Sequence, residues 1–424
     1  NTACGNSALA ANTTGAYNTA VGADSVKTAT TATKNTGIGY EALEATTTGS
    51  YNTAVGSNCM KTNTTGASNV AVGQGALNLN TTGSNNVAIG VNVLDANTTA
   101  GNNTAVGFQA MTDNTTGALN AALGREALFK NTTGNQNTAC GTYALYENLT
   151  GIENTAVGYV ALEKNLASYN TAVGSRALDL NTTGSSNTAL GYQSLTSNTT
   201  AGDNTALGYG AMAANSTGTQ NTAVGSAALD ANTTADNNTA IGYNSLTANT
   251  TGSSNNAFGA ESMMTNTTGN QNCAFGRQSL KTNNGSYNNG FGHQTLELNT
   301  TGTQNQAFGL NALFANTTGS YNSAFGHAAL TSNTTASYNT AVGDQCLGVC
   351  TTGESNTAVG ARALDALTTA NNNTSIGYSS NSGRTTGNDN TAVGAYCMNA
   401  AATGDSNTGL GKSALHDLTS GATN

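Results

Sequence analysis

Few residues of this sequence are of the types that usually carry out chemistry, and they are scattered along it. His293 and His327 occupy equivalent places, two units apart, in a repeat described below, and His416 is the third histidine. Metal sites need several such ligands close together, so we expect exposed histidines and no bound metal. Cys346 and Cys350 are close enough for a disulfide in a secreted chain, and no paired C-x-x-C zinc spacing is present. Because no acid, base and nucleophile converge, we expect neither catalysis nor a cofactor.

Tyrosine is the residue type best suited to touching a ligand, because its ring is apolar and its hydroxyl is polar. Several tyrosines recur at equivalent places of the same repeat. They form an amphipathic surface that would suit contact with glycans, although solvated tyrosines on a polar surface explain the pattern equally well. These residues are Tyr40, Tyr51, Tyr159, Tyr192, Tyr209, Tyr243 and Tyr321.

The composition differs from that of an ordinary globular protein. The 424 residues include no Pro, no Trp and 52 Gly, and only 8% are charged. Disorder would usually bring more Pro and more charge, so a repeat structure is favoured. The net charge is −9 with only 12 Lys and Arg, which predicts no nucleic-acid partner. No apolar run approaches the ~20 residues of a membrane span, so we expect none in this segment.

A repeat beginning with Asn covers the whole chain. Counting from one "NTAVG"-like Asn to the next gives 23 steps of 17 and two of 16, from Asn1 to Asn424. Such a period is typical of a quasi-one-dimensional repeat protein. We therefore predict one continuous array over residues 1–424. Because the sequence begins and ends within its repeat, we expect it to be part of a longer fibre protein.

The repeat has invariant places, numbered here from its first Asn. The fifth is Gly in every unit, which predicts an unusual backbone angle or a close approach and hence a turn. The third is Ala, Gly or Ser, the fourth is always apolar, and the ninth is apolar except at Asn381. Examples are Gly5, Gly22, Gly56 and Gly411 at the fifth place and Val21, Ile38 and Val55 at the fourth.

These places predict an all-β fold. The invariant Gly, the β-branched residues and the "NTTG" segment argue against a helical repeat. We expect a strand at "NTAVG", a second strand around "xxALxx", and a turn at "NTTG". One coil per repeat gives a parallel β-solenoid, or β-roll, of 25 coils, with strands stacked about 4.8 Å apart. Stacked first-place amides such as those of Asn18, Asn52 and Asn69 would then form hydrogen-bonded ladders.

Five consecutive repeats carry Phe at the fourth place. A tight interior lined by Ala would resist the change from Val to Phe, so the fourth column should face a roomier space. We expect that space to be shared between copies of the chain, most simply three, with the column facing its partners. A single chain whose interior widens locally is the alternative. The residues are Phe258, Phe275, Phe291, Phe308 and Phe325.

The repeat resembles a known class of surface proteins. "NTAVG", "NVAIG" at 86–90 and "NTAIG" at 238–242 resemble the head repeats of trimeric autotransporter adhesins. The longer unit "NTAVGSAALDANTT" at 221–234 is similar to repeats of bacterial and phage tail-fibre-like surface proteins. The resemblance covers all 25 units and implies a left-handed, homotrimeric β-roll on a cell or virion surface. The period is longer here than in the adhesin heads.

The function expected from these features is structural and adhesive. We expect a non-enzymatic, extracellular segment that spaces or presents attachment sites, with copies of itself as partners and surface glycans or a host or prey cell as targets. A phage tail-fibre shaft is the close alternative. An ice- or glycan-binding solenoid is a further one, although the paired Thr of "NTT" lies in a presumed turn and not in a regular T-x-T face.

Overall fold

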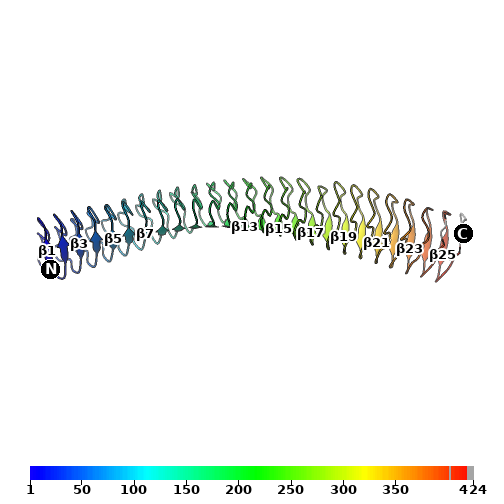
Figure 1. The fold of residues 1–424 in the computed structure, drawn as a ribbon, viewed down its shortest axis with the longest axis horizontal. Coiled ribbons are helices and arrows are strands. Elements are labelled where there is room, and N and C mark those ends of the chain that lie inside the picture. Colours follow the sequence, from blue (N-terminus) through cyan, green and yellow to red (C-terminus); the bar gives the residue numbers. More distant parts are fainter. Residues whose placement is uncertain (401–402, 418–424) are drawn as a thin grey trace. The chain divides into compact units, whose positions relative to one another are not determined.

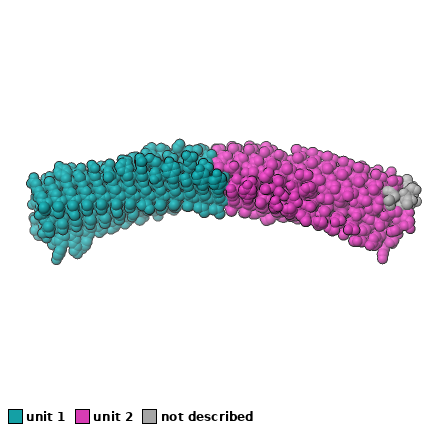
Figure 2. All heavy atoms as spheres, in the orientation of Figure 1, with its two compact units in different colours: residues 1–210 teal, residues 211–424 magenta. Residues whose placement is uncertain are grey.

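A computed structural model describes residues 1–400 and 403–417. The chain divides into two compact units, Asn1–Gly210 (unit 1) and Ala211–Asn424 (unit 2), which are distinguished by colour in Figure 2. Each repeat contributes one short strand, formed by its second to fourth places. Among the described residues there is no helix. The prediction of an all-β chain is therefore confirmed, and each unit is described separately below.

Among the residues that the structure describes, unit 1 holds thirteen strands and unit 2 holds twelve. Figure 1 labels the strands where there is room. Those of unit 1 are β1 (Thr2–Cys4), β2 (Thr19–Val21), β3 (Thr36–Ile38), β4 (Thr53–Val55), β5 (Val70–Val72), β6 (Val87–Ile89), β7 (Thr104–Val106), β8 (Ala121–Leu123), β9 (Thr138–Cys140), β10 (Thr155–Val157), β11 (Thr171–Val173), β12 (Thr188–Leu190) and β13 (Thr205–Leu207). Those of unit 2 are β14 (Thr222–Val224), β15 (Thr239–Ile241), β16 (Asn256–Phe258), β17 (Cys273–Phe275), β18 (Asn289–Phe291), β19 (Gln306–Phe308), β20 (Ser323–Phe325), β21 (Thr340–Val342), β22 (Thr357–Val359), β23 (Thr374–Ile376), β24 (Thr391–Val393) and β25 (Thr408–Leu410).

Within each unit, every strand pairs in parallel with the strand of the next repeat. In unit 1, Val55 of β4 lies opposite Val72 of β5, and in unit 2 Phe258 of β16 lies opposite Phe275 of β17. Equal places are thus always neighbours, and one repeat makes one coil. The fold is a parallel β-solenoid, as the period predicts.

The prediction of a second strand around "xxALxx" is wrong. This segment is a succession of turns in which the seventh and ninth places have left-handed backbone angles, such as φ 57° at Asn58 and 49° at Met60. The amide of Met60 still donates to the carbonyl of Ala76 in the next coil, at 2.9 Å. The eighth-place amide of Ala76 instead bonds within its own coil, to the Gly73 carbonyl. A coil this short must reverse its direction quickly, and alternating hands of backbone angle achieve this without an extended segment.

The fifth-place glycines adopt a conformation that other residues rarely take. The φ angles are 143° at Gly5, 130° at Gly22, 142° at Gly56 and 116° at Gly411. A Cβ added to Gly22 would lie 2.5 Å from the carbonyl oxygen of Gly39 in the next coil. Both the angle and the close approach expected from the sequence are therefore present, and they occur at the point where the strand ends and the turns begin.

The interior of each coil is narrow and contains mostly small side chains. Between the first and the last described coil, the third-place and eighth-place Ala and the ninth-place Leu or Met are buried, as for Ala54, Ala71 and Leu77. At Gly37, which occupies a third place, an added Cβ would lie 2.6 Å from a methyl group of Val26. The third place faces the ninth place so closely that nothing much larger than Ala fits, which explains its restriction to Ala, Gly and Ser.

The first-place Asn side chains from Asn18 to Asn407 are buried, and they link each coil to the next. The Asn52 side-chain oxygen accepts a hydrogen bond from the backbone N–H of Asn69 at 3.0 Å, and its amide donates to the Gly66 carbonyl at 2.8 Å. The Asn18 oxygen likewise accepts from the backbone N–H of Asn35. These Asn residues form ladders, but their most regular bond is from side chain to backbone and not between amides. Each side chain satisfies buried backbone groups that would otherwise lack a partner.

A second ladder, made directly between amides, runs through the twelfth places. The Asn80 amide donates to the Asn63 side-chain oxygen at 2.9 Å and to the Gly83 carbonyl at 3.0 Å. Its own oxygen accepts from the Asn97 amide at 2.8 Å. Each amide therefore closes the "NTTG" turn of its coil and joins the neighbouring coils, which is why Asn recurs there.

Replacing Asn80 with Asp should destabilise the protein by about 3 kcal/mol at neutral pH. Asp removes both donated hydrogen bonds and buries a carboxylate against two acceptor oxygens. Burial raises the pKa of such a carboxyl above its unfolded value. The loss should therefore be smallest below the unfolded pKa, where both states are protonated, should grow as the pH rises from the unfolded toward the folded pKa, and should stay constant above it. Urea unfolding at about pH 3 and about pH 7 measures this difference.

The matched control is Asn85→Asp in the same repeat. Asn85 is exposed at the seventeenth place, where Asp203 occurs naturally in another coil. This change should alter stability by less than about 0.5 kcal/mol at either pH. Equal effects of the two substitutions would mean that the buried amide ladder contributes nothing to stability.

The coil that starts at Asn373 departs from the pattern inside the solenoid. Asn381 replaces the ninth-place Leu, and Arg384 occupies the twelfth place with its side chain fully buried. The Arg384 Nε donates to the Asn381 side-chain oxygen at 3.0 Å, and its Nη1 donates to the carbonyl of Gly404. Burial lowers the pKa of Arg384. Among the described residues, its Nη2 and the Asn381 amide nitrogen have no hydrogen-bond partner.

The two shortened coils keep the register of their neighbours. In the coil that starts at Asn154, the missing residue comes from the "NTTG" segment, and the Asn165 amide closes the shortened turn by donating to the Ala167 carbonyl at 2.7 Å. Thr155 of β10 still lies opposite Thr171 of β11. The deletion is therefore absorbed by the turn, as the sequence predicts.

Candidate binding site

The seventh places of successive coils form a line of side chains on the outside of unit 1. Tyr143, Val160 and Arg176 occupy this place in three consecutive coils, with φ of 59°, 51° and 60°. Backbone hydrogen bonds hold each to the coil before it, as from the Tyr143 amide to the Arg125 carbonyl at 3.1 Å. Because all three share one backbone conformation, differences in side-chain size alone shape the surface along this line.

Aromatic rings cluster on one side of Val160. Tyr146 stacks on Phe129 of the preceding coil, with ring centroids 5.2 Å apart and planes inclined by 8°. Tyr143 meets Tyr146 edge to face at 5.6 Å and 76°. Tyr143 and Tyr146 are both partly buried and so are held in place by neighbours. Together they form a preordered aromatic wall.

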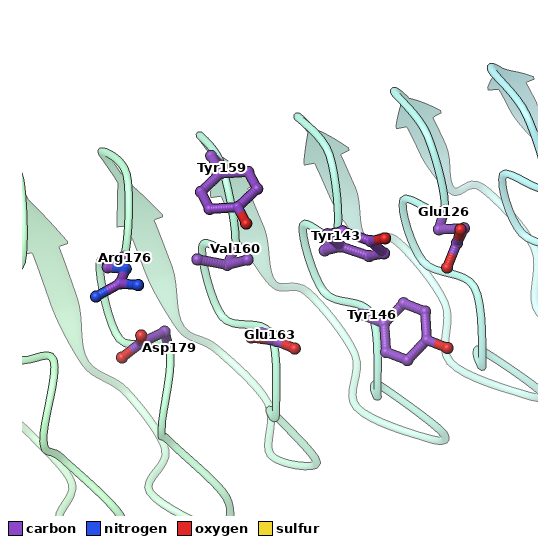
Figure 3. Close-up of a pocket in the computed structure, with 8 residues that line it drawn as sticks. All are labelled: Glu126, Tyr143, Tyr146, Tyr159, Val160, Glu163, Arg176 and Asp179. Atoms are coloured by element: carbon purple, nitrogen blue, oxygen red, sulfur yellow. The ribbon is translucent and has the colours of Figure 1, made fainter.

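A hollow of about 450 Å³ opens over Val160 (Figure 3). Val160 is 7% exposed and is much smaller than its seventh-place neighbours Tyr143 and Arg176. Figure 3 shows Arg176 and Asp179 on one side of Val160 and the two tyrosines of the aromatic wall on the other. The complete lining is Glu126, Tyr143, Tyr146, Tyr159, Val160, Glu163, Arg176 and Asp179.

Charged groups surround the hollow, and several are paired. Arg125 Nε lies 2.9 Å from the Glu126 carboxylate, and the Arg125 guanidinium lies 5.7 Å from the centre of the Tyr143 ring. Burial raises the pKa of Asp179, and a hydrogen bond from the Thr196 hydroxyl, at 2.7 Å, opposes that rise. The hollow thus combines ring faces with carboxylate acceptors and a guanidinium donor. This combination suits a ligand that has both an apolar face and hydroxyl groups.

Sequence reasoning identified only Tyr159 among the residues that line this hollow. The other lining residues lie at the seventh and tenth places, which resembled ordinary solvated positions. The sequence did contain a signal for the hollow in the seventh-place column. Tyr143, Val160 and Arg176 follow each other at this place in consecutive repeats. A small residue between two large ones in a stacked column predicts a depression at that level.

The fourth-place column lies on the outside of the single chain. Val21 is 38% exposed, Ile38 is 40% exposed, and Val55 is half-buried. The strand alternation that buries the third-place Ala points the fourth place outward. The alternative of an interior that widens locally around the Phe residues is therefore wrong, because that column does not face the interior of its own coil.

The five Phe residues of unit 2 form a continuous outer stack. Neighbouring ring centroids lie 4.3 to 5.5 Å apart, and the planes are inclined by 4° to 15°. Phe275 and Phe325 are 44% and 40% exposed. The other three, Phe258, Phe291 and Phe308, are half-buried.

No histidine or cysteine is among the residues that line this hollow. His327 contacts Asp344 at 2.8 Å, and within the described ranges no three His, Cys, Asp or Glu residues are grouped as metal ligands would be. Cys346 and Cys350 are both free and buried, and their thiols donate to the carbonyls of Ala358 and Gly353. Burial raises the pKa of Cys346 to about 12 and that of Cys350 to about 11, so both thiols are protonated and unreactive at neutral pH.

Comparison with protein families and with curated proteins finds no match to this sequence. In the part of the chain that the structure describes, no helix has the length and apolarity needed to cross a membrane.

Proposed function

We propose that this chain is a structural and adhesive segment of an extracellular fibre or surface adhesin, in which copies associate through the fourth-place column. The simplest assembly is a homotrimer of left-handed coils, in line with the resemblance to adhesin head repeats. The observation that carries the proposal is the row of apolar side chains on the outside of each unit. Exposed apolar patches larger than roughly 300–600 Å² usually mark interaction surfaces.

The Phe stack of unit 2 supports this proposal. An aromatic side chain buries about 150–250 Å² when fully covered. The five aligned rings remain partly exposed, so covering them would contribute a large favourable free energy to association. Neighbouring chains that covered the stack would remove its outer edges from water. The stack also extends over consecutive strands, β16 to β20, as a shared interface would require.

An apolar groove in unit 1 supports lateral packing as well. It lies over β7, β8 and β9, has a volume of about 420 Å³, and is bordered by Val106, Leu123 and Cys140. It opens where Ala121 occupies the second place, which is Thr in most coils. A side chain from a neighbouring copy would fill such a groove and improve the packing.

The role that follows is to space and present attachment surfaces. A solenoid whose coils contact only their neighbours can be long, and it displays one side chain per coil at each outer place. A phage tail-fibre shaft would use the same architecture. Ice binding is disfavoured because β16 to β20 carry Phe at the fourth place and Asn, Cys, Gln or Ser at the second, which interrupts any regular face of Thr and Val.

Light scattering of the purified chain tests the proposed association. We expect a mass three times the 42.1 kDa of one chain. The triple variant Ile38→Lys, Val55→Lys and Val72→Lys should shift that mass toward a single chain, because buried unpaired ammonium groups are costly. Its circular dichroism should stay unchanged, since these side chains lie outside the coil.

The matched control is the triple variant Tyr40→Lys, Ser57→Lys and Gln74→Lys, which introduces the same three charges at the sixth places of the same three coils. We expect its mass to equal that of the unmodified protein. A mass of 42.1 kDa for the unmodified chain would contradict the association. A fourth-place triple variant that keeps the assembled mass would place the interface elsewhere.

A further inference from the structure

We propose that the hollow over Val160 binds one uncharged pyranose ring of a surface glycan. The inference adds a ligand to the proposed adhesive function and rests on that function for its biological meaning. The residues that line the hollow lie at the sixth, seventh and tenth places and not in the fourth-place column. Sugar binding and self-association can therefore fail independently.

The spacing of the coils gives the hollow the thickness of one ring. Tyr143 and Arg176 are two coils apart, which corresponds to about 9.6 Å at the usual strand spacing. In the coil between them, the seventh place holds only the short Val160 side chain, while Tyr159 and Glu163 of the same coil also line the hollow. A ring placed at that level lies about 4.8 Å from each neighbouring level. Phe129 and Tyr146 stack at a similar distance, 5.2 Å. The ligand would thus occupy the position of a missing side chain in the column.

The lining provides the two kinds of contact that a pyranose needs. Its apolar C–H face can pack on the aromatic wall of Tyr143 and Tyr146, which their mutual contact holds in place. Its hydroxyl groups need acceptors and donors, and Glu163, Asp179 and Arg176 supply them around the rim. A flat aromatic hydrocarbon would fit the same space but would offer the carboxylates no hydrogen-bond donor of its own.

The charges of the lining favour an uncharged sugar over an acidic one. Glu126 is neutralised by its ion pair with Arg125. Glu163 and Asp179 then carry two negative charges against the one positive charge of Arg176. A uronic acid or sialic acid would bring its own carboxylate close to these groups, and like charges at short range repel.

Titration of the full chain with methyl glycosides tests this inference. The probes are the methyl glycosides of glucose, galactose, mannose and N-acetylglucosamine, with glucuronic acid and sialic acid methyl glycosides as charged comparators. Calorimetry or saturation-transfer NMR should give at least one uncharged sugar a dissociation constant on the order of 1 mM. No binding by any uncharged probe, or tighter binding of an acidic probe, would overturn the inference.

A variant that fills the hollow gives the most direct test of the binding site. Val160→Tyr should weaken binding at least about tenfold by occupying the level of the ring. The fold should tolerate it, because Tyr143 and Tyr396 already hold the seventh place with φ of 59° and 57°. The control is Ala227→Tyr, the same new side chain at a seventh place of unit 2, where φ is 52°. It should leave the affinity unchanged.

These variants also separate the two proposals. Val160→Tyr should keep the assembled mass, because Val160 lies outside the fourth-place column. Unchanged sugar affinity in Val160→Tyr would show that the sugar binds elsewhere, and would overturn the assignment to this hollow. A single-chain mass combined with sugar binding would contradict the association alone.

Discussion

Replacing Gly22 with Ala is expected to lower the free energy of unfolding by more than about 3 kcal/mol. The φ of 130° lies in a region that is essentially restricted to Gly. In addition, the new Cβ would lie 2.5 Å from the Gly39 carbonyl oxygen, which is backbone and cannot move away without separating the coils. Thermal unfolding followed by circular dichroism, with amide hydrogen exchange at β2 and β3, measures the effect.

Gly75→Ala is the matched control for this prediction. Gly75 occupies a seventh place with φ of 64°, and Ala227 and Ala328 hold the equivalent place at 52°. There an added Cβ would meet the side-chain oxygen of Asn92, which can rotate away. We expect a change within about 1 kcal/mol. A Gly22→Ala variant as stable as Gly75→Ala would show that the coils can separate at little cost.

Restoring the repeat pattern inside the coil that starts at Asn373 should stabilise the protein. The double variant Asn381→Leu and Arg384→Asn removes a buried guanidinium with an unpaired nitrogen and returns a Leu to the ninth place. Leu364 and Met398 hold that place, buried, in the two adjacent coils. We expect a gain of about 2–4 kcal/mol, since replacing buried charges with packed apolar groups often stabilises by that amount. Hydrogen exchange of the amides in this coil measures the gain locally.

The single variants complete a double-mutant cycle. Asn381→Leu alone should be destabilising, because the Arg384 Nε loses the acceptor that lies 3.0 Å away. Arg384→Asn alone should give only part of the gain, because Asn381 would remain buried without Arg384. A double variant less stable than the natural sequence would show that this polar pair contributes to stability.

The period and the invariant places predicted the architecture well. Gly at every fifth place and small residues at every third place indicated that neighbouring groups lie very close to the backbone there. The structure has both close contacts, at Gly22 with the Gly39 carbonyl and at Gly37 with the Val26 side chain. The second strand was predicted wrongly because adjacent apolar residues such as the Ala and Leu of "xxALxx" suit a strand as well as they suit the buried turns that the structure has. The left-handed backbone angles of this segment, such as φ 52° at Leu77, are not accompanied by the residue types that usually adopt them. Leu is not a residue that usually signals such a conformation.

The candidate site was harder to predict for a different reason. The repeat pattern predicts the features that all coils share, whereas the hollow arises where the side chains of one coil differ from those of its neighbours. Val160 is an ordinary residue by itself and matters only between Tyr143 and Arg176. The outward direction of the fourth column also needed the structure, since an apolar column at Val21 or Ile38 suits an interior and an interface equally well.

The preserved register at the shortened coil that starts at Asn154 has a consequence for the length of the array. Each coil meets its neighbours through the same groups, so Thr155 pairs with Thr171 and Thr138 in one common register despite the lost residue. We therefore expect that deleting one whole repeat brings together two coils that present matching groups, with no mismatched junction. The length of the array is thus a quantity that can be changed in steps of one coil, while the outward-facing side chains of the remaining coils are unaffected.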